Sequence, residues 1–404
     1  MTSPNNIPGH VAAERVFSFD IHKDSLLQDG LHEGYAKLIE QAPDVFYTPK
    51  NGGHWVVTRF AYAEEILRDP ANFTSSEMEI PRIAKPMGLI PINLDPPHSV
   101  PYRHVLMPYF SPKSVAEREE SLRTWARHFV SAVAAKGSCD FLKDIASQFP
   151  VTVFMEMMGI PFDRLESFRA IAEEYLDDIA EARRYELAGQ VHAIMMELIE
   201  ARRIAPGDDL VSVLVNAQVE GRPLNTDELL KMTLLLFLGG LDTVVNVLTF
   251  SYRALAEDPA LQARLVRDPA AIPGFIEECL RLFGVVNVPR MVARDVERFG
   301  VAFRAGDMVL CLNSQLGREA RENPDPLTID VDRKNRRLLT FSTGAHLCVG
   351  HNLARSEMRI LTEEWLKQIP QFHVSAGFAP KFRAGMVMSL KDLPLEWTPA
   401  PAAS

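Results

Sequence analysis

The chain has 404 residues, of which 47% are hydrophobic, and this is enough to bury a large core. Its 43 basic and 53 acidic residues give a net charge of −10, which argues against nucleic acid as a partner. The N-terminus has no charged-then-apolar signal pattern, and no run approaches the roughly 18 apolar residues of a membrane span. The four cysteines are widely scattered, which argues against a disulfide framework or a zinc site. We therefore expect a soluble, cytoplasmic protein that makes no contact with a membrane.

Helical periodicity dominates the chain, with a few short strand-like segments. The pattern predicts strands at 54–58, 300–303 and 307–311. It predicts helices at 60–69, 115–136, 164–202 with a break inside it, 226–253, 271–283 and 350–368. The proline-rich segments 79–101 and 321–327 are typical of ordered irregular connections. Because no composition shift marks a boundary, we expect one mainly α domain with a small β region over residues 1–404.

The predicted helix 226–253 shows a conflict between local preference and position. Its segment Leu234–Leu238 is apolar on every side, which predicts a path through the protein interior. Gly239 and Gly240 follow, although each costs on the order of 1 kcal/mol in a helix relative to alanine. Asp242 comes next, and a buried carboxylate is costly unless it is paired. Conflicts of this kind often mark a functional site.

Thr243 gives this conflict a chemical interpretation. It lies four residues after Gly239, so its hydroxyl can bond the Gly239 carbonyl in place of the usual helical N–H. That bond would open a groove in the helix, with room for a diatomic ligand. Asp242 would point elsewhere and could relay protons from solvent. The alternative is a glycine pair that eases close helix packing, with Thr243 bonding back to its own helix.

The segment from Phe341 to Gly350 places a single cysteine, Cys348, directly before the last predicted helix. A cysteine thiolate is a strong, soft ligand that haem iron accepts. Glycines let the backbone turn tightly there, and N–H groups at the start of the helix favour the anion. Phe341 would shield the sulfur from water. The alternative is a small buried thiol with no chemical role.

Together, the pattern Phe-x-x-Gly-x-x-x-Cys-x-Gly and the segment Gly-Gly-Leu-Asp-Thr resemble the cytochrome P450 family, the haem-thiolate monooxygenases, and most closely its bacterial camphor hydroxylase group. The resemblance spans nearly the whole chain. It implies a mainly α fold that holds haem b between the long central helix and the helix after the Cys loop. It also implies that Cys348 is the proximal iron ligand, and that Asp242 and Thr243 deliver protons during dioxygen activation.

The resemblance assigns further residues to the haem and its surroundings. Members of the family usually have a histidine four residues before the arginine that matches Arg103, whereas this chain has Ser99. The implied haem-binding residues are Arg103, Arg290 and His346, which would hold the propionates, and Phe341 and Gly350 of the loop. The implied structural triad, which would hold the proximal side of the haem, is Glu278, Arg281 and Arg333.

The substrate pocket is where the sequence departs from the camphor hydroxylases. Met87 falls at the position of their substrate-binding tyrosine, and methionine offers only a weak acceptor in place of a phenolic O–H. The other pocket positions implied are apolar, and each could also be ordinary core: Leu235, Leu238, Gly239, Val286, Val288, Met386 and Val387. The set predicts a small apolar substrate of terpenoid or norisoprenoid size that is held by shape.

Electrons must come from outside, because the sequence contains no flavin or iron–sulfur motif. A basic run at Arg333, Lys334, Arg336 and Arg337 could form a positive face for an acidic [2Fe-2S] ferredoxin, although such runs are often solvated turns. One alternative function is a hydroxylase driven by peroxide. Another is a haem-binding sensor or sequestering protein without turnover. A cysteine-dependent hydrolase would need a Cys-His-Asn arrangement that the sequence does not suggest.

Overall fold

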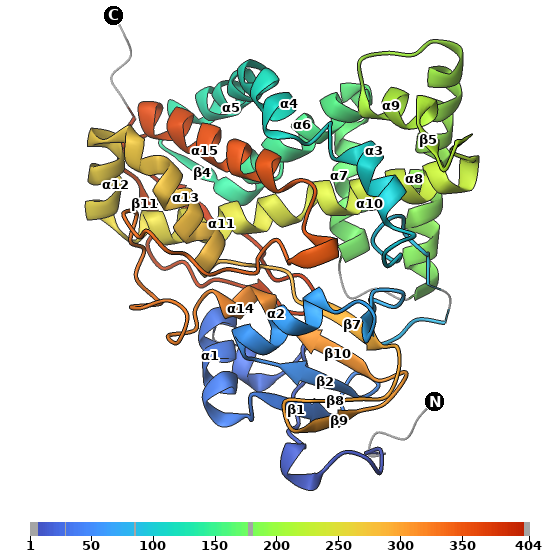
Figure 1. The fold of residues 1–404 in the computed structure, drawn as a ribbon. Helices are drawn as coiled ribbons and strands as arrows, with labels where there is room; N and C mark the ends of the chain where they lie inside the picture. The colour runs from blue at the N-terminus through green and yellow to red at the C-terminus, as the bar shows by residue number, and fades with distance from the viewer. Residues whose placement is uncertain (1–6, 29, 85, 177–180, 400–404) are drawn as a thin grey trace, which may run out of the picture.

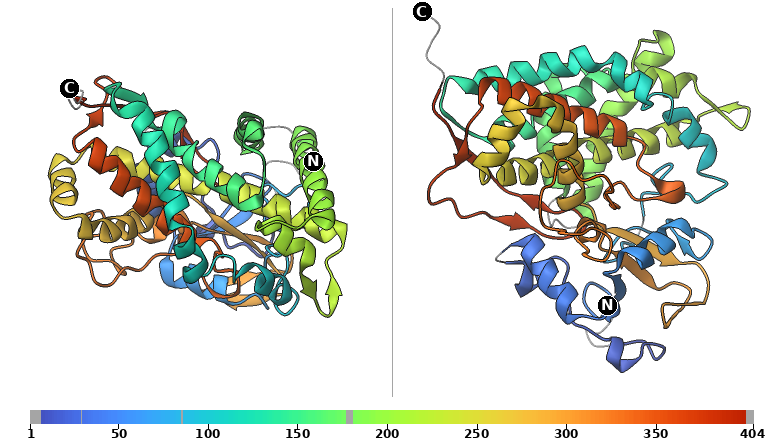
Figure 2. Two further views of the ribbon diagram at one scale, coloured as in Figure 1. Left: turned by 90° about the horizontal axis from the view of Figure 1, so that it is seen from above. Right: turned by 60° about the vertical axis from the view of Figure 1, so that its left-hand side comes forward.

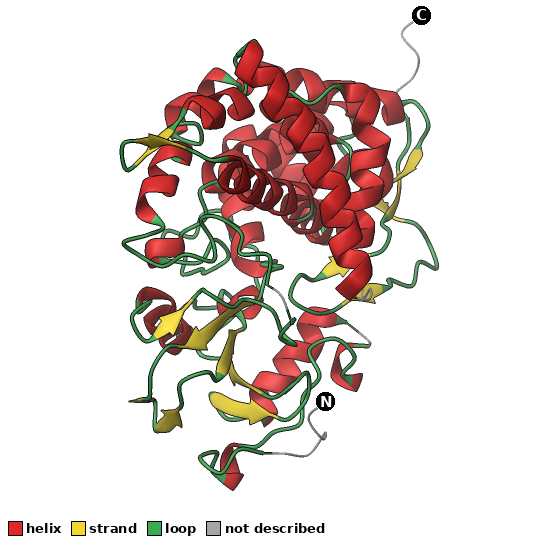
Figure 3. Ribbon diagram, turned by 90° about the vertical axis from the view of Figure 1, so that its right-hand side faces the viewer, coloured by secondary structure: helices red, strands yellow, loops and turns green. Residues whose placement is uncertain are grey.

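A computed structural model describes residues 7–28, 30–84, 86–176 and 181–399. A large helical body lies beside a smaller region that holds most of the β-structure (Figure 1, Figure 3). The predicted mainly α class with a small β region is therefore confirmed.

The helices occupy most of the predicted segments. Segment 164–202 falls into α7 and α8, on either side of residues 177–180, which lie outside the described residues. Among the described residues the α-helices are α1 (Leu31–Gln41), α2 (Phe60–Arg68), α3 (Val100–Leu106), α4 (Pro112–Glu117), α5 (Glu119–Ala134), α6 (Phe149–Met158), α7 (Leu165–Leu176), α8 (Glu181–Ile204), α9 (Leu210–Asn216), α10 (Thr226–Leu241), α11 (Thr243–Ala256), α12 (Pro259–Arg267), α13 (Ile272–Leu282), α14 (Asn313–Leu316) and α15 (His351–Gln368).

The strands are short and include the three predicted ones. Those described are β1 (Val45–Thr48), β2 (His54–Val57), β3 (Phe73–Thr74), β4 (Ser138–Asp140), β5 (Gln218–Val219), β6 (Arg222–Pro223), β7 (Val288–Val292), β8 (Val296–Arg298), β9 (Val301–Phe303), β10 (Met308–Cys311), β11 (His373–Val374), β12 (Phe382–Arg383), β13 (Ser389–Leu390) and β14 (Pro394–Glu396).

The largest sheet has the strand order β1-β2-β10-β7-β3. Strands β2 and β10 pair in parallel, with Trp55 opposite Val309, and the other neighbours are antiparallel. Every residue of β2 and β10 is buried, as expected for central strands that are covered on both faces. Helix α2 packs its apolar side, including Phe60 and Ile66, against this sheet. The sheet fixes β7, whose first residues reach the candidate site.

Helices α10 and α11 form a nearly continuous rod through the helical body (Figure 1). Asn225 caps the N-terminus, and Glu228 completes a capping box by bonding back to the Asn225 N–H. The segment Thr226–Ala256 is long and apolar enough to cross a membrane, but 61% of its apolar window is buried inside the protein. In Figure 3, which looks nearly along the rod, other helices surround it. Its apolar surface is therefore accounted for by the core.

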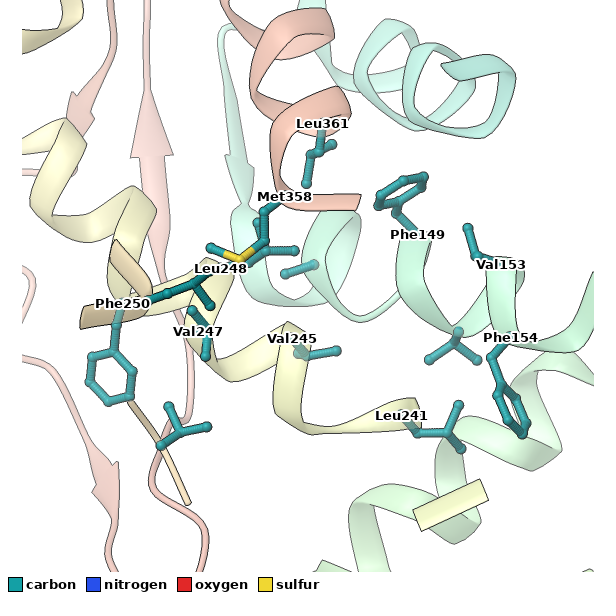
Figure 4. Close-up of a cluster of buried hydrophobic side chains, with 14 of the residues drawn as sticks. Phe149, Val153, Phe154, Leu241, Val245, Val247, Leu248, Phe250, Met358 and Leu361 are labelled. Atoms are coloured by element: carbon teal, nitrogen blue, oxygen red, sulfur yellow. The ribbon is translucent and has the colours of Figure 1, made fainter. Parts of the chain in front are cut away.

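Helix α15 packs along α5 on one side and approaches the central rod on the other (Figure 1, Figure 2). Met358 and Leu361 of α15 lie in a cluster with Val247 of α11 and Phe149 of α6 (Figure 4). Side chains of this kind contribute about 1.5–3 kcal/mol each when they are fully buried. This packing fixes α15, and hence the loop before it, relative to the rod.

Glu278 on α13 anchors the segment that leads to the Cys loop. Its carboxylate accepts hydrogen bonds from Arg281 at 2.7 and 2.9 Å and from Arg333 at 3.1 Å, as the predicted triad requires. Arg336, which the sequence analysis placed on a surface face, adds a further bond at 3.1 Å. The side chains of Glu278 and Arg281 are fully buried. Burial opposes the charge, but Arg281 and Arg333 hold the pKa of Glu278 below its usual value.

We expect Glu278→Gln to lower the free energy of unfolding by about 3 kcal/mol or more, because the guanidinium of Arg281 would remain buried without its counter-ion. Urea unfolding followed by circular dichroism measures this loss. Asp332→Asn, which breaks an exposed ion pair with Arg264 near the same segment, is the control and should leave the midpoint unchanged. Equal effects of the two variants would contradict a structural role for the cluster.

Candidate functional site

One cavity collects most of the predicted site residues. It has a volume of about 340 Å³ and is bounded by α10, α11, α15, the Cys loop and the segment that enters β7. Its wall is mostly apolar. Cys348 and Thr243, about a hundred positions apart in the sequence, both line it. The fold therefore brings together the two motifs that the sequence analysis singled out.

The Cys loop presents the sulfur of Cys348 to this cavity. The Cys348 N–H donates to the Phe341 carbonyl at 2.9 Å, which closes the loop. Gly344 has φ +65°, a conformation that favours glycine, and a Cβ there would lie 3.3 Å from the Leu67 carbonyl oxygen. Burial raises the pKa of the Cys348 thiol, whereas the backbone N–H of Gly350 opposes this rise, as predicted for a helix start.

Phe341 covers one side of the loop. Its ring centroid lies 6.0 Å from that of His351 and 4.7 Å from the guanidinium carbon of Arg355. Arg355 is held in turn by Glu277 at 2.6 Å. Phe341 is therefore held in place by His351 and Arg355, and it also lines the cavity.

The central rod is interrupted where the sequence predicted a groove. The Thr243 hydroxyl donates to the Gly239 carbonyl at 3.1 Å, which confirms the expected bond. Helix α10 ends at Leu241 and α11 begins at Thr243, and Asp242 between them has φ −115° and ψ −33°. A Cβ on Gly239 would meet nothing within 4 Å, so open space faces this turn.

Asp242 is not among the described residues that line the cavity. Its Oδ2 accepts a hydrogen bond from Nη2 of Arg383 at 3.1 Å. Burial raises the pKa of Asp242, while the charge of Arg383 and the side chain of Asn246 act against the rise. The sequence analysis did not find Arg383, which lies 141 residues further along the chain.

Three cationic or ionisable side chains line another part of the cavity, and all three were predicted. Arg290 is only 2% exposed, and its Nη1 donates to its neighbour's carbonyl, Pro289, at 2.8 Å. Within the described chain no carboxylate forms an ion pair with it. Arg103 donates to the Leu347 carbonyl at 2.6 Å.

His346, the third of these side chains, lies against the half-buried carboxylate of Asp95. Its Nε2 is 3.1 Å from Ser75 Oγ and 3.3 Å from Asp95 Oδ1. Burial alone would raise the pKa of Asp95, but hydrogen bonds from His346, Thr74 and Ser75 lower it to about 2. Asp95 therefore fixes the orientation of the His346 ring.

The predicted pocket residues divide into two groups. Leu235, Gly239, Val286 and Val288 line the cavity, whereas Leu238, Met386 and Val387 are partly buried against the core outside its lining. Leu238 does not line the cavity because residues 235, 239 and 243, spaced four apart along α10 and into α11, form the face toward it.

Met87, predicted as a pocket residue, is not found in the wall of the cavity. Met87 is outside the lining in the described residues, and its sulfur accepts a hydrogen bond from the Tyr175 hydroxyl at 3.4 Å. Met78 lines the cavity instead. Residue spacing from a distant motif could not locate a side chain in so irregular a segment.

The predicted positive face is largely absent. Arg333 and Arg336 are bound to Glu278 and are only 9% and 16% exposed. Arg337 pairs with Glu64 at 2.7 Å. Residues of this run therefore serve internal anchoring, and only Lys334 remains as an exposed member without an ion pair in the described part of the chain.

Glu357 is a further cavity residue that the sequence analysis missed. It is 3% exposed, lies on α15 two turns beyond Cys348, and forms no hydrogen bond or ion pair with the described residues. Burial raises its pKa to about 8. Nothing in its spacing distinguishes it from Glu363 and Glu364 of the same helix, which both form ion pairs.

Comparisons with known proteins agree with the site. The family model for cytochrome P450 matches residues 140–375. The probable cytochrome P450 127A1 of Sinorhizobium fredii is 32% identical over 403 residues, which cover 97% of both chains. The steroid C26-monooxygenase of Mycobacterium tuberculosis is 31% identical over 320 residues, 77% of this chain and 86% of that one. The crystal structure of CYP101J2 superimposes with a TM-score of 0.91 at 35% identity, covering 98% of this chain and 100% of that chain.

The chain belongs to the cytochrome P450 family, as the Cys loop predicted. It is a cytochrome P450 monooxygenase, an oxidoreductase, and the family binds haem b through a cysteine thiolate.

The residues of the cavity fit haem. Cys348 offers a sulfur ligand whose charge is favoured by backbone N–H groups. Arg290 is a buried cation without a carboxylate partner in the described chain, which is costly unless an anionic group such as a propionate reaches it. The open space beside Gly239 leaves room for a bound group between the central rod and the Cys loop.

Glu357→Gln should remove a pH dependence of stability. Between its ordinary pKa of 4.5 and its folded value of about 8, the folded protein holds a proton that the unfolded chain has released. Stability due to this group is therefore fully present below pH 4.5, declines as the pH rises, and levels off above about pH 8. The variant should be the more stable protein at the alkaline end. Urea unfolding across this range measures the difference, and parallel curves for the two proteins would contradict it.

Proposed function

We propose that this protein hydroxylates a small apolar substrate of terpenoid or norisoprenoid type, with Cys348 as the proximal ligand of haem b. One observation carries the proposal: Cys348 and the Thr243 hydroxyl line the same apolar cavity, at the point where the central rod is broken. Residues 1–404 serve this function as a single domain.

When bound, haem with a thiolate ligand supplies the reductive activation of dioxygen and the insertion of one oxygen atom into a C–H bond. The chain's own residues hold and surround it. In our proposal Arg103, Arg290 and His346 hold the propionates. Phe341 and Gly350 shape the loop that keeps the sulfur in place.

Asp242 and Thr243 manage protons in this proposal. The Thr243 hydroxyl faces the cavity, and its bond to the Gly239 carbonyl fixes its orientation. Asp242, which lies at the break itself, bonds to Arg383 and is not among the described residues that line the cavity. A carboxyl group whose pKa burial has raised holds a proton more readily than an exposed one, so it can take up a proton and pass it on.

The wall of the cavity supports a compact apolar substrate. Leu235, Val286 and Val288 offer only hydrocarbon. The one amide in this part of the wall, Asn287, is already bound, since its Nδ2 donates to the Gly385 carbonyl at 3.2 Å and its Oδ1 accepts from Ser314 at 2.7 Å. Haem must share the same space. Curated relatives are named for larger substrates, including a vitamin D(3) 25-hydroxylase and the steroid C26-monooxygenase.

We further propose that a [2Fe-2S] ferredoxin supplies the electrons and that the protein works in the cytoplasm. The proposal of a ferredoxin as electron donor rests on the family relation, because most of the basic run that suggested it is bound to glutamates. The location is supported by the burial of the one helical segment with enough apolar length to span a membrane, in the described part of the chain.

The visible spectrum of the reduced protein under carbon monoxide tests the ligand. The purified protein should show the strongly red-shifted Soret band of thiolate-ligated haem, and Cys348→His should show a band at the shorter wavelength of histidine ligation. Cys139→Ser, which changes a partly buried cysteine far from the cavity lining, is the control and should keep the red-shifted band. A red-shifted band in Cys348→His would sink the assignment.

Thr243→Val should lower product formed per electron consumed by roughly tenfold or more, because it removes the hydroxyl but keeps the branched shape. Thr243→Ser keeps the hydroxyl and should stay close to the unchanged protein. Parallel assays of product and electron consumption measure the ratio. An unaltered ratio in Thr243→Val would show that Thr243 has no part in proton delivery, and absence of product from all three proteins would favour the sensor alternative.

A further inference from the structure

The carboxylate of Asp242 is held by a cation from the far end of the chain. Arg383 lies on β12, and its Nη2 is 3.1 Å from Asp242 Oδ2. Both side chains are mostly buried, at 16% and 18% exposure. An ion pair in such a place is sensitive to the loss of either partner, because the remaining charge is left poorly solvated.

The hairpin that carries Arg383 also forms part of the cavity's outer support. Strands β12 and β13 pair with each other, and the residues between them bond to the segment that enters β7. The Asn287 N–H donates to the Met386 carbonyl at 2.9 Å, and the Met388 N–H donates to the Val285 carbonyl at 2.8 Å. Val285 and Asn287 line the cavity. Backbone bonds thus fix the position of Arg383 relative to the cavity wall.

Among the described residues, Arg383, Asn246 and Lys391 influence the charge state of Asp242. Burial raises the pKa of its carboxyl group. The charge of Arg383 acts most strongly against this, followed by the hydrogen bond of Asn246, the hydrogen bond of Arg383 and the charge of Lys391. Asn246 is one turn further along α11, and Lys391 follows β13. Arg383 is the group that forms a direct ion pair with Asp242 among these.

We propose that Arg383 is the positioning residue for proton delivery, acting through Asp242. It holds the carboxylate in one orientation, and its charge sustains the ionised form that must exist between successive proton transfers. Because the hairpin is bonded to the cavity wall, the carboxylate keeps a fixed position relative to the groove at Thr243. The inference rests on the proposed role of Asp242.

A purely structural role would be different. In that case Arg383 would only fasten the C-terminal hairpin to the central rod, and its loss would lower stability without moving the titration of Asp242 or the pH profile. Arg383→Gln removes the charge at similar length, and Arg383→Lys keeps it. Lys381→Gln removes an exposed charge from the residue before β12 and serves as the matched control.

The first measurement is the titration of Asp242 in the haem-loaded protein, followed by its protonated-carboxyl stretch in infrared difference spectra and assigned with Asp242→Asn. The Asp242 pKa should rise in Arg383→Gln, return toward its original value in Arg383→Lys, and stay unchanged in Lys381→Gln. An unchanged titration in Arg383→Gln, in protein that still gives the red-shifted carbon monoxide band, would overturn the inference and leave the role of Asp242 intact.

The second measurement is product formed per electron across a pH series. Arg383→Gln should lower this ratio at neutral pH by roughly tenfold and move its rising limb to higher pH, while Arg383→Lys stays close to the unchanged protein. Substrate binding, read from the spin-state change of the spectrum, should remain within about twofold in all variants. A shifted titration with an unchanged ratio would overturn the proposed role of Asp242 itself, and the inference with it.

Discussion

The hydrogen bond from the Thr243 hydroxyl to the Gly239 carbonyl is the interaction on which the site depends. A helix through the interior of a large protein normally offers no polar group to a cavity, because its N–H and C=O groups are bonded along the axis. Here a side-chain hydroxyl takes up one carbonyl, and the helix is interrupted at Asp242. The interruption exposes polar atoms on an apolar rod. It is tolerated because α6, α15 and the other helices around the rod supply the burial that the local sequence does not favour (Figure 4).

Two buried arginines in this protein, Arg281 and Arg290, differ in whether the protein itself supplies a negatively charged partner. Glu278 is surrounded by Arg281, Arg333 and Arg336, so every charge there has a protein partner. Arg290 is equally buried but has only a neighbouring carbonyl among the described residues. The first arrangement holds the fold together without a ligand. The second is satisfied only when an anionic group enters the cavity, which is what a haem propionate would do.

The features that the sequence predicted are those set by local spacing. Thr243 reaches Gly239 because residues four apart in a helix are neighbours, and Glu278 reaches Arg281 by the same rule at three. Arg383 and Glu357 could not be found in this way. Arg383 acts across 141 residues, and Glu357 differs from the equally buried Glu364 only in having no partner among the described residues. The prediction that Met87 lines the pocket failed for a related reason. In an irregular segment no helical or strand period relates the position of a residue in the sequence to the direction of its side chain.

The apolar wall that suits a hydrocarbon substrate also governs every charge near it. Low-dielectric surroundings make an unpaired charge costly, so the buried Asp242 carboxylate needs Arg383. In the cavity wall, Glu357 has no partner among the described residues and stays protonated up to about pH 8. Cys348 obeys the same constraint. Burial raises the pKa of its thiol, and the N–H of Gly350 and the charge of Arg103 offset this only in part. A metal cation on the sulfur would favour the thiolate further, and in the proposed function the iron of a bound haem would be that cation.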